Sequence, residues 1–309
     1  MKLCSLVVAA LVITMTVGGC FFTGVENTAR VTDKEVNRVI TEIESRQPSS
    51  SLSTQIQPLK SWRVGKRFHV VDDQVLMFFD QMGGQDSLHL QGQVVTFAGL
   101  SQSPSLLQRQ AVDVTFDYQG HKLVYHTGRP LEEIPDNFTI PLLIDLDMVQ
   151  DVNRQIAGRA VWVKTSIWYD PLSEQMRKGR QLVPVVISRV EPGNKVMPLK
   201  VVFTIPGGSD SAAVWMSQPG AVMPGRDFDS MFALSNPRDN YPSISDATWT
   251  LIQQGMVTNG MTKEECRLAM GPPKRTAYVP DQTGMREYWY YDGAAYLYFV
   301  DGRLKEFRK

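Results

Sequence analysis

The chain has 309 residues, and its 32 lysines and arginines are balanced by 32 aspartates and glutamates. This length favours two or three domains, each with enough apolar residues for a core. Zero net charge argues against a nucleic-acid partner, because phosphates require a basic surface. Three cysteines are too few for a disulfide framework or a four-cysteine zinc site.

The N-terminus has the pattern of an export signal. Lys2 precedes an apolar run over 6–17, which is too short to span a bilayer comfortably. Residues 17–20, Val-Gly-Gly-Cys, resemble the bacterial lipobox, whose cysteine is acylated and becomes the new N-terminus. We therefore predict a signal peptide over 1–19 and lipidation of Cys20, whose acyl chains would bind a bilayer. The alternative is an ordinary signal peptide in which Cys20 has no special role.

The residues that follow Cys20 bear on which membrane is the target. Phe21 stands where the enterobacterial rule for inner-membrane retention has an aspartate. The next residues also lack an early acidic run that would resemble a surface-export signal. By analogy we predict a lipid anchor in the outer membrane, with the protein facing the periplasm.

Residues 20–57 are predicted to form a tether. Thr32 and Glu35 have the spacing of a capping box, and apolar residues at 36, 39, 40 and 43 follow at helical spacing. We predict a short amphipathic helix over 32–46, followed by a serine-rich linker. The helix either packs on its own domain, which is the simpler expectation, or docks on a partner.

Residues 58–140 and 141–235 are predicted to form two β-rich modules. Alternation over 112–118, a turn at Gln119-Gly120 and the run 121–127 predict a β-hairpin. The second module is predicted to contain strands over 160–168, 182–190, 196–205 and 212–216. We expect two small barrels or sandwiches. The similarity of 90–97 to 156–163, and of 114–116 to 201–203, is explained equally well by a duplication and by chance resemblance between β-rich segments.

The last stretch, 236–309, combines two short helices with strands. Ser245 begins one helix, and Thr262 with Glu265 forms a capping box for another, which Gly271 ends. Asp-Gly pairs, typical of tight hairpin turns, separate three predicted strands over 286–292, 295–300 and 303–307. The predicted fold class is therefore α+β: two small β-rich modules, barrel- or sandwich-like, followed by two helices and an antiparallel three-stranded meander.

A set of residues within 244–309 forms an ordered motif: Gly260, Met261, Thr262, Glu265, Gly271, Pro273, Trp289, Tyr290, Phe299 and Gly302. In order and spacing these residues resemble the BamE-like family, also called SmpA/OmlA. That family has a helix, then Gly-Met-Thr, an acidic helix ending in Leu-Gly-x-Pro, a Trp-Tyr strand, and a final strand with Phe-x-x-Gly. The chain as a whole resembles lipoproteins of Bacteroides-type bacteria. The resemblance implies structural roles for these residues and an envelope protein as partner.

The sequence contains no Gly-x-Ser-x-Gly elbow, no His-Glu-x-x-His and no phosphate-binding loop. His121 and His126, with Asp113 and Asp117 nearby, would form a metal site only if their side chains shared a face. Solvated strand faces are the simpler interpretation. Turns and exposed surfaces likewise explain the acidic residues at 72, 73, 145, 147 and 151. We predict no catalytic residue, no metal and no cofactor.

Cys266 admits two interpretations. It lies near a predicted helix N-terminus, where the pKa of a thiol is lowered. It also stands at the position that pairs with Met261 in a hydrophobic staple, which points the side chain into the core. We predict that Cys266 is a packing residue.

Aromatic residues are dense near the C-terminus. Strand alternation places Tyr288 and Tyr290 on one face and Trp289 and Tyr291 on the other. One set is expected to fill the core beneath the helices, and the other to be exposed unless something covers it. The candidate protein-binding surface comprises Tyr288, Trp289, Tyr290, Tyr291, Tyr296 and Tyr298.

Together these features predict a non-enzymatic adaptor or scaffold on the outer membrane, with a role in envelope or outer-membrane protein assembly. One alternative is a protein- or glycan-binding lipoprotein unrelated to assembly. Another is an envelope enzyme, which convergent carboxylates or histidines in one pocket would favour.

Overall fold

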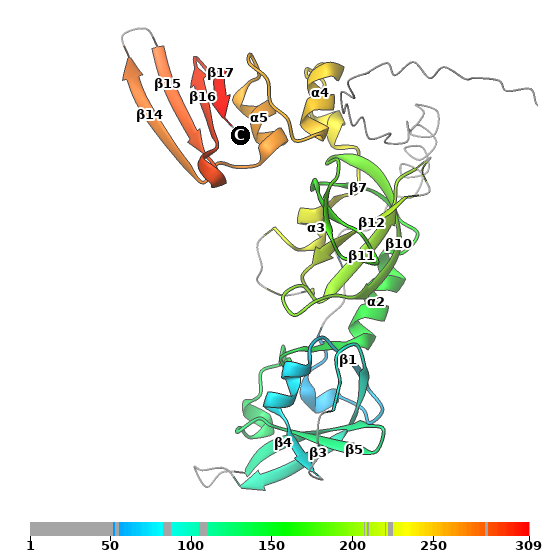
Figure 1. Cartoon of the computed structure of the whole chain (residues 1–309). Helices are drawn as coiled ribbons and strands as arrows, with labels where there is room; N and C mark the ends of the chain where they lie inside the picture. The colour runs from blue at the N-terminus through cyan, green and yellow to red at the C-terminus, as the bar shows by residue number, and fades with distance from the viewer. Residues whose placement is uncertain are drawn as a thin grey trace, which may run out of the picture. The chain divides into compact units, whose positions relative to one another are not determined.

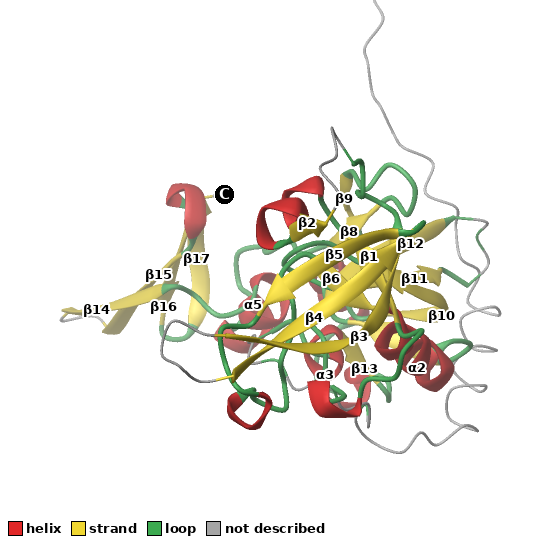
Figure 2. Cartoon of the chain, turned by 90° about the horizontal axis from the view of Figure 1, so that it is seen from below, coloured by secondary structure: helices red, strands yellow, loops and turns green. Residues whose placement is uncertain are grey.

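The computed structural model divides the chain into Met1–Arg30 and Val31–Lys309, and every described residue lies in the second unit. The described residues are 52, 56–82, 88–104, 110–206, 208, 210–219, 221, 225–281 and 284–308. The predicted signal peptide, Cys20 and the predicted helix over 32–46 lie outside them. The fold is α+β and β-rich, and the described strands pair only in antiparallel fashion (Figures 1 and 2).

The first sheet has the strand order β2-β5-β4-β3-β1-β6. Its strands are β1 (Arg67–Val70), β2 (Asp80–Met82), β3 (Val94–Pro104), β4 (Gln110–Tyr118), β5 (His121–His126) and β6 (Leu143–Asp145). The short helices η1 (Leu59–Ser61), η2 (Asp73–Phe78) and η3 (Leu131–Glu133) accompany it. One face packs into a core that includes Phe68, Val95, Val114, Phe116 and Leu123. Because β6 belongs here, the first sheet extends past residue 140, where the first module was expected to end.

The hairpin expected around residue 120 is confirmed. β4 and β5 pair from Asp113 opposite His126 to Tyr118 opposite His121. The turn residues Gln119 and Gly120 have φ angles of 52° and 89°. Both lie in the left-handed region, which glycine adopts without the steric cost that a side chain brings. The turn therefore places alternate residues of both strands on the same face.

The second sheet has the order β13-β7-β10-β11-β12-β8-β9. Its strands are β7 (Ala160–Val163), β8 (Ile167–Tyr169), β9 (Met176–Lys178), β10 (Val183–Pro192), β11 (Leu199–Thr204), β12 (Ser211–Met216) and β13 (Phe232–Ala233). Helices α2 (Leu146–Ile156) and α3 (Phe228–Met231) contribute to its core. In α2 the apolar residues recur at helical spacing and are buried, namely Met148, Val149, Val152 and Ile156.

The prediction of a single strand over 160–168 is wrong. This segment forms β7 and β8, which lie at different places in the sheet with three strands between them. Lys164, which follows β7, donates its backbone N–H to the Met231 carbonyl at 2.8 Å and so extends the pairing of β7 with β13 by one residue. Four strand spacings would cover about 19 Å in a flat sheet, whereas the four residue steps from Val163 to Ile167 reach only about 14 Å. The second sheet must therefore curl to bring β7 and β8 within reach of this short connection.

The topology does not support the suggested duplication. The similar segments 90–97 and 156–163 contain the start of β3 and all of β7, and the similar segments 114–116 and 201–203 lie in β4 and β11. β3 pairs directly with β4, whereas β10 separates β7 from β11. Helix α2 ends two residues before Gly158, whereas the residues directly before Gly92, 88–91, are not helical. The two sheets thus have different strand orders, which a duplication of one module would not produce.

The third sheet has the order β14-β15-β16-β17. Its strands are β14 (Arg275–Asp281), β15 (Gly284–Tyr290), β16 (Tyr296–Val300) and β17 (Arg303–Arg308). The helices are α4 (Asp246–Gln253), α5 (Lys263–Met270), η4 (Pro237–Asn240) and η5 (Asp292–Ala294). The prediction of three strands is wrong, because β14 pairs with β15 along all of its seven residues.

The loop before α5 is joined to the last strand. Gly260 donates its N–H to the Leu304 carbonyl over 2.7 Å, and Leu304 donates to the Met261 carbonyl over 2.8 Å. Gly260 has a φ of 92°, a conformation that a residue with a side chain rarely adopts. These bonds fix the start of α5 against the sheet and bury Met261 in the third core.

The capping box predicted for α5 is confirmed. The Thr262 hydroxyl accepts the Glu265 N–H at 3.1 Å, and the Glu265 carboxylate accepts the Thr262 N–H at 2.6 Å. Gly271, with a φ of 79°, follows the last helical residue. No helix among the described residues is both long enough and apolar enough to cross a membrane.

Candidate functional site

The third sheet has two chemically different faces. Trp289, Leu297, Phe299 and Leu304 point to the core that contains residues of α4 and α5. Because neighbours along a strand alternate, the opposite face carries four tyrosines, which we call the tyrosine face: Tyr288, Tyr290, Tyr296 and Tyr298. All four are half-buried, and none belongs to the described hydrophobic core.

Three of the four tyrosine rings, those of Tyr288, Tyr290 and Tyr298, stack on one another. The centroids of the Tyr288 and Tyr298 rings are 4.6 Å apart, with an angle of 26° between the planes. Tyr288 and Tyr290 are 6.3 Å apart and inclined by 18°. The Arg275 guanidinium lies 4.1 Å from the centre of the Tyr290 ring, within the range of a cation–π contact. These contacts direct ring faces toward each other and hold the side chains in a defined arrangement.

Charged side chains accompany the tyrosines on this face. Strand register places Arg275 opposite Tyr290, Arg308 opposite Tyr296 and Glu306 opposite Tyr298. Arg286 and Arg303, which are both opposite Val300, belong to the same face, and the Arg303 guanidinium donates to the Gly260 carbonyl at 3.1 Å. The Tyr296 hydroxyl donates a hydrogen bond to Glu306, and this bond raises the pKa of Tyr296. The described residues of the tyrosine face thus include four arginines and one glutamate.

Two of the six aromatic residues proposed for the surface lie on the other face. Trp289 is 1% exposed, its indole N–H donates to Glu287 over 2.6 Å, and the Arg267 guanidinium lies 5.2 Å from its ring. The Tyr291 hydroxyl donates to the Gly271 carbonyl, and burial raises the pKa of Tyr291 to about 12. Both side chains therefore act in packing, and we leave them out of the candidate surface.

Glu287 lies beneath α5 and is 3% exposed. Burial by itself raises the pKa of a carboxyl group, but an ion pair with Lys263 and the Trp289 hydrogen bond outweigh it. The pKa of Glu287 is consequently below its usual range. The buried charge is thus paired on the helix side and contributes nothing to the tyrosine face.

The residues of the family motif occupy caps, turns and the core. Gly260 and Thr262 set the start of α5, and Glu265 completes its cap. Met261, Trp289 and Phe299 are core residues, and Gly302 forms the β16–β17 turn with a φ of 75°. Pro273 lies between α5 and β14. These positions shape the scaffold that supports the tyrosine face.

Cys266 is fully buried in the third core. Burial raises the pKa of its thiol to about 12, with a further contribution from the nearby Glu265 carboxylate. The thiolate, which is the nucleophilic form, is therefore strongly disfavoured at neutral pH.

One of the polar groupings singled out in the sequence does come together. His126 contacts Asp113 from β4, and its other ring nitrogen contacts Asp80 from β2. His121 and Asp117 are not part of this group. Asp80 precedes His126 by 46 positions, and no local pattern connects them. Among the described residues, no group of histidine, cysteine and carboxylate side chains is arranged to hold a metal ion.

The remaining acidic candidates have structural roles. Asp145 and Asp147 pair with the Lys66 ammonium at 2.8 and 3.0 Å, and the Lys66 side chain is 3% exposed. Asp72 accepts the Gln74 N–H at the start of η2. Asp73 accepts the backbone N–H groups of Leu90 and Gln91, and these bonds lower the pKa of Asp73. Caps and ion pairs therefore account for these carboxylates.

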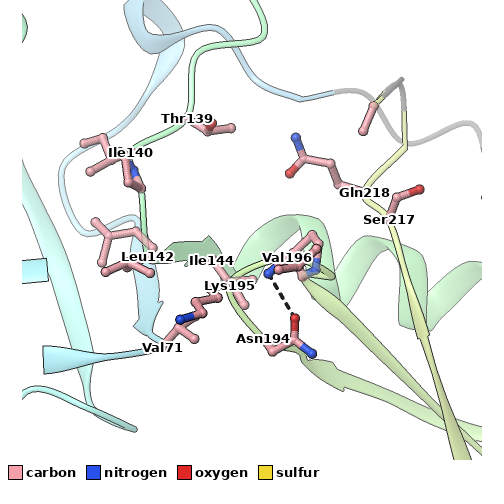
Figure 3. A pocket seen from close by; sticks show the side chains of 14 residues that line it. Val71, Thr139, Ile140, Leu142, Ile144, Asn194, Lys195, Val196, Ser217 and Gln218 are labelled. Carbon is pink, nitrogen blue, oxygen red and sulfur yellow. Dashed lines mark hydrogen bonds between the residues drawn. The ribbon is translucent and has the colours of Figure 1, made fainter. Parts of the chain in front are cut away.

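A cavity of about 210 Å³ opens between the segments 139–144 and 194–198 (Figure 3). Its described lining is largely apolar, and Lys195 is its one charged residue. Asn194 accepts the Val196 N–H at 2.9 Å and so shapes the turn at its edge. This lining holds no pair of groups suited to acid–base or nucleophilic chemistry, which leaves the tyrosine face as the candidate site.

Comparison of the chain with known protein families, with curated proteins and with solved structures finds no match in any of the three.

Proposed function

We propose that this protein is a non-enzymatic adaptor of the bacterial envelope, anchored in the outer membrane through acylated Cys20. Its tyrosine face would bind an acidic surface of a protein partner. The observation that carries the proposal is the gathering of four tyrosines and four arginines on the sheet face opposite the helices.

Tyrosine and arginine are the residue types that interface hot spots favour, together with tryptophan. Tyrosine offers a large contact area for the loss of few rotamers, and its hydroxyl group adds a hydrogen bond. Stacking between Tyr288, Tyr290 and Tyr298 already restricts these side chains in the unbound protein. Less conformational entropy is then lost when a partner binds.

The charge of the tyrosine face favours an acidic partner. Arg275 and Arg308 are exposed at its margins, and Glu306 is engaged by the Tyr296 hydroxyl. Opposite charge on the partner would accelerate association and select the correct orientation. A glycan is a weaker candidate, because sugars stack on open aromatic ring faces and these rings face one another.

The enzyme alternative has less support from the geometry. Both ring nitrogens of His126 already face carboxylates, at 2.9 and 2.8 Å, so neither is positioned to take a proton from a substrate. Two helices on one face of an antiparallel sheet fit the BamE-like resemblance, which supports envelope or outer-membrane protein assembly as the setting of the adaptor.

Photo-crosslinking in the native membrane tests the partner class. A photoreactive amino acid replaces Val279, which is 47% exposed on the tyrosine face, or Val94, which is 41% exposed in the first sheet. We expect a specific product from position 279 only, with the crosslinked partner peptide rich in aspartate and glutamate. Equal products from both positions, or a basic partner peptide, would contradict the proposal.

Substitutions on the two sides of the same sheet provide the matched comparison. Tyr298→Ala should weaken binding by about 2 kcal/mol, roughly thirtyfold in Kd, with little change in thermal stability. Tyr278→Ala removes an exposed tyrosine on the other side of β14 and should leave binding unchanged. Arg275→Glu should slow association, whereas Arg67→Glu in the first sheet should not. Equal loss of stability and binding in Tyr298→Ala would identify that residue as core.

The anchor is tested separately from the surface. Cys20→Ser should abolish incorporation of a labelled fatty acid and release the protein from membranes, since several acyl chains are needed for stable anchoring. Cys4→Ser lies within the predicted signal peptide and should leave both properties unchanged. Continued labelling of Cys20→Ser would exclude Cys20 as the lipidation site.

A further inference from the structure

His126, on β5, lies between two carboxylates in the first sheet. Its Nδ1 is 2.9 Å from Asp113 on β4, and its Nε2 is 2.8 Å from Asp80 on β2. The Ser103 hydroxyl of β3 donates to the same Asp113 oxygen at 2.8 Å. One network of side chains therefore connects four strands of the sheet.

The geometry determines how many protons the ring carries. An ionised carboxylate only accepts hydrogen bonds, and a neutral imidazole donates from only one nitrogen. Both contacts of His126 are satisfied together only by the doubly protonated imidazolium. Its hydrogen bonds to Asp113 and then Asp80 raise the pKa of His126, in the direction that favours this form.

The two carboxylates differ in their environment. The Asp113 side chain is 9% exposed and the Asp80 side chain is 78% exposed. The other charged group that lines the depression around His126 is Lys122 of β5, and the hydroxyl groups of Ser101 and Thr115 complete its polar side. When the ring keeps a single proton, that proton is expected on Nδ1, where it preserves the hydrogen bond to the buried Asp113, because a buried charge without a partner is costly. Asp80 is then the partner that is lost.

Asp80 belongs to the edge of the sheet. β2 contains three residues and pairs with β5 through Asp80, Gln81 and Met82. Within the described sheet β2 is the terminal strand, so its ladder to β5 holds it from one side. The Asp80–His126 contact adds a side-chain connection to this short ladder.

We propose that His126 is a proton-controlled clasp that holds β2 on the edge of β5 in its imidazolium form and releases it when the ring loses a proton. Release would uncover backbone N–H and C=O groups of β5, which can then pair with another strand. The pKa of His126 is raised in the folded protein, so the contribution of the clasp to stability is complete below the unfolded-state pKa and is lost as the pH rises through the folded-state pKa. The clasp is independent of the tyrosine face.

Hydrogen exchange of the full chain, combined with NMR titration of the imidazole, tests this inference. After correction for intrinsic exchange, protection of the β2 and β5 edge amides should fall at least threefold as the pH rises through the His126 transition. Protection of β3 and β4 amides should stay constant. Constant protection of β2 across the His126 transition would overturn the proposal, as would full protection of the β2 amides at a pH where the NMR titration shows a singly protonated imidazole.

Substitutions test whether His126 is responsible for the pH-dependent loss of amide protection. His126→Gln has one amide donor group that does not titrate, and it should remove the pH-dependent step. His121→Gln changes the other histidine of β5 and should retain it. Asp80→Asn alters an exposed position and should shrink the step and lower its midpoint, which keeps the test available if His126→Gln does not fold. A step that persists unchanged in Asp80→Asn would overturn the proposal.

Discussion

At Cys266 two effects act on one side chain in opposite directions. The residue is the fourth of α5, where the helix dipole lowers the pKa of a thiol. Burial in the third core acts the other way and dominates, since the pKa of Cys266 is raised to about 12. For the pKa of Cys266, burial of the sulfur therefore outweighs its position near the start of the helix.

Substitution and labelling at Cys266 test this balance. In a background with Cys4→Ser and Cys20→Ser, a thiol reagent at pH 8 should react with Cys266 only after urea unfolding. Cys266→Val should change the free energy of unfolding by less than about 1.5 kcal/mol, because its volume is similar. Cys266→Asp should cost several kcal/mol, because it buries a polar group without a partner. Rapid labelling of the folded protein would show that the thiol is accessible.

At the scale of the element, α5 illustrates how a short helix is defined. It has eight residues, fewer than an isolated helix needs to be stable in water. Packing of Cys266 and Ala269 stabilises one face, while the Thr262–Glu265 capping box satisfies N–H groups that the first turn leaves unpaired. The same helix supplies Lys263, which pairs with buried Glu287.

Removal of the cap should be measurable without loss of the fold. Thr262→Ala leaves the Glu265 N–H without its acceptor and should lower the free energy of unfolding by about 1 kcal/mol. Thr262→Ser keeps a hydroxyl in the same place and should be close to wild type. Urea denaturation monitored by tryptophan fluorescence measures both. Equal stability of the alanine and serine variants would show that the cap contributes little.

At the scale of the whole molecule, one amide connects the second sheet to the helices of the third. Gln181 lies between β9 and β10, and its Nε2 is 2.7–2.9 Å from the carbonyl oxygens of Ile252, Leu268 and Ala269, which share its two N–H donors. These carbonyls are near the C-terminal ends of α4 and α5, where helices leave acceptors unpaired. Leu182, the next residue, belongs to the third core.

Loss of this amide should destabilise the protein. Gln181→Ala leaves buried carbonyls without a donor and should lower the free energy of unfolding by about 2 kcal/mol. Gln181→Glu should cost more, because a carboxylate faces carbonyl oxygens. Gln74→Ala, at an exposed position of η2, is the control and should stay within about 0.5 kcal/mol of wild type. Urea midpoints at constant m-value provide the comparison. An unchanged midpoint for Gln181→Ala would refute this role.

Local patterns in the sequence were sufficient for several features of the fold. Alternation and the Gln119-Gly120 turn predicted the β4–β5 hairpin, and the Thr262–Glu265 spacing predicted a cap that the structure contains. Alternation also separated Tyr288 from Trp289, although the sequence did not decide which of the two was buried. These features depend on residues a few positions apart, so their physical causes are present in a short segment.

Only the tertiary structure decided the rest. The strand expected over 160–168 was divided between two places in the sheet, because β7 pairs with β10 and β13 whereas β8 pairs with β9 and β12. The contact of His126 with Asp80 and that of Gln181 with Ala269 join residues 46 and 88 positions apart. Burial of Trp289 beneath the helices, and with it the position of the tyrosine face, also depends on packing. Such contacts leave no periodic pattern in the sequence, because they form only when whole elements are packed together.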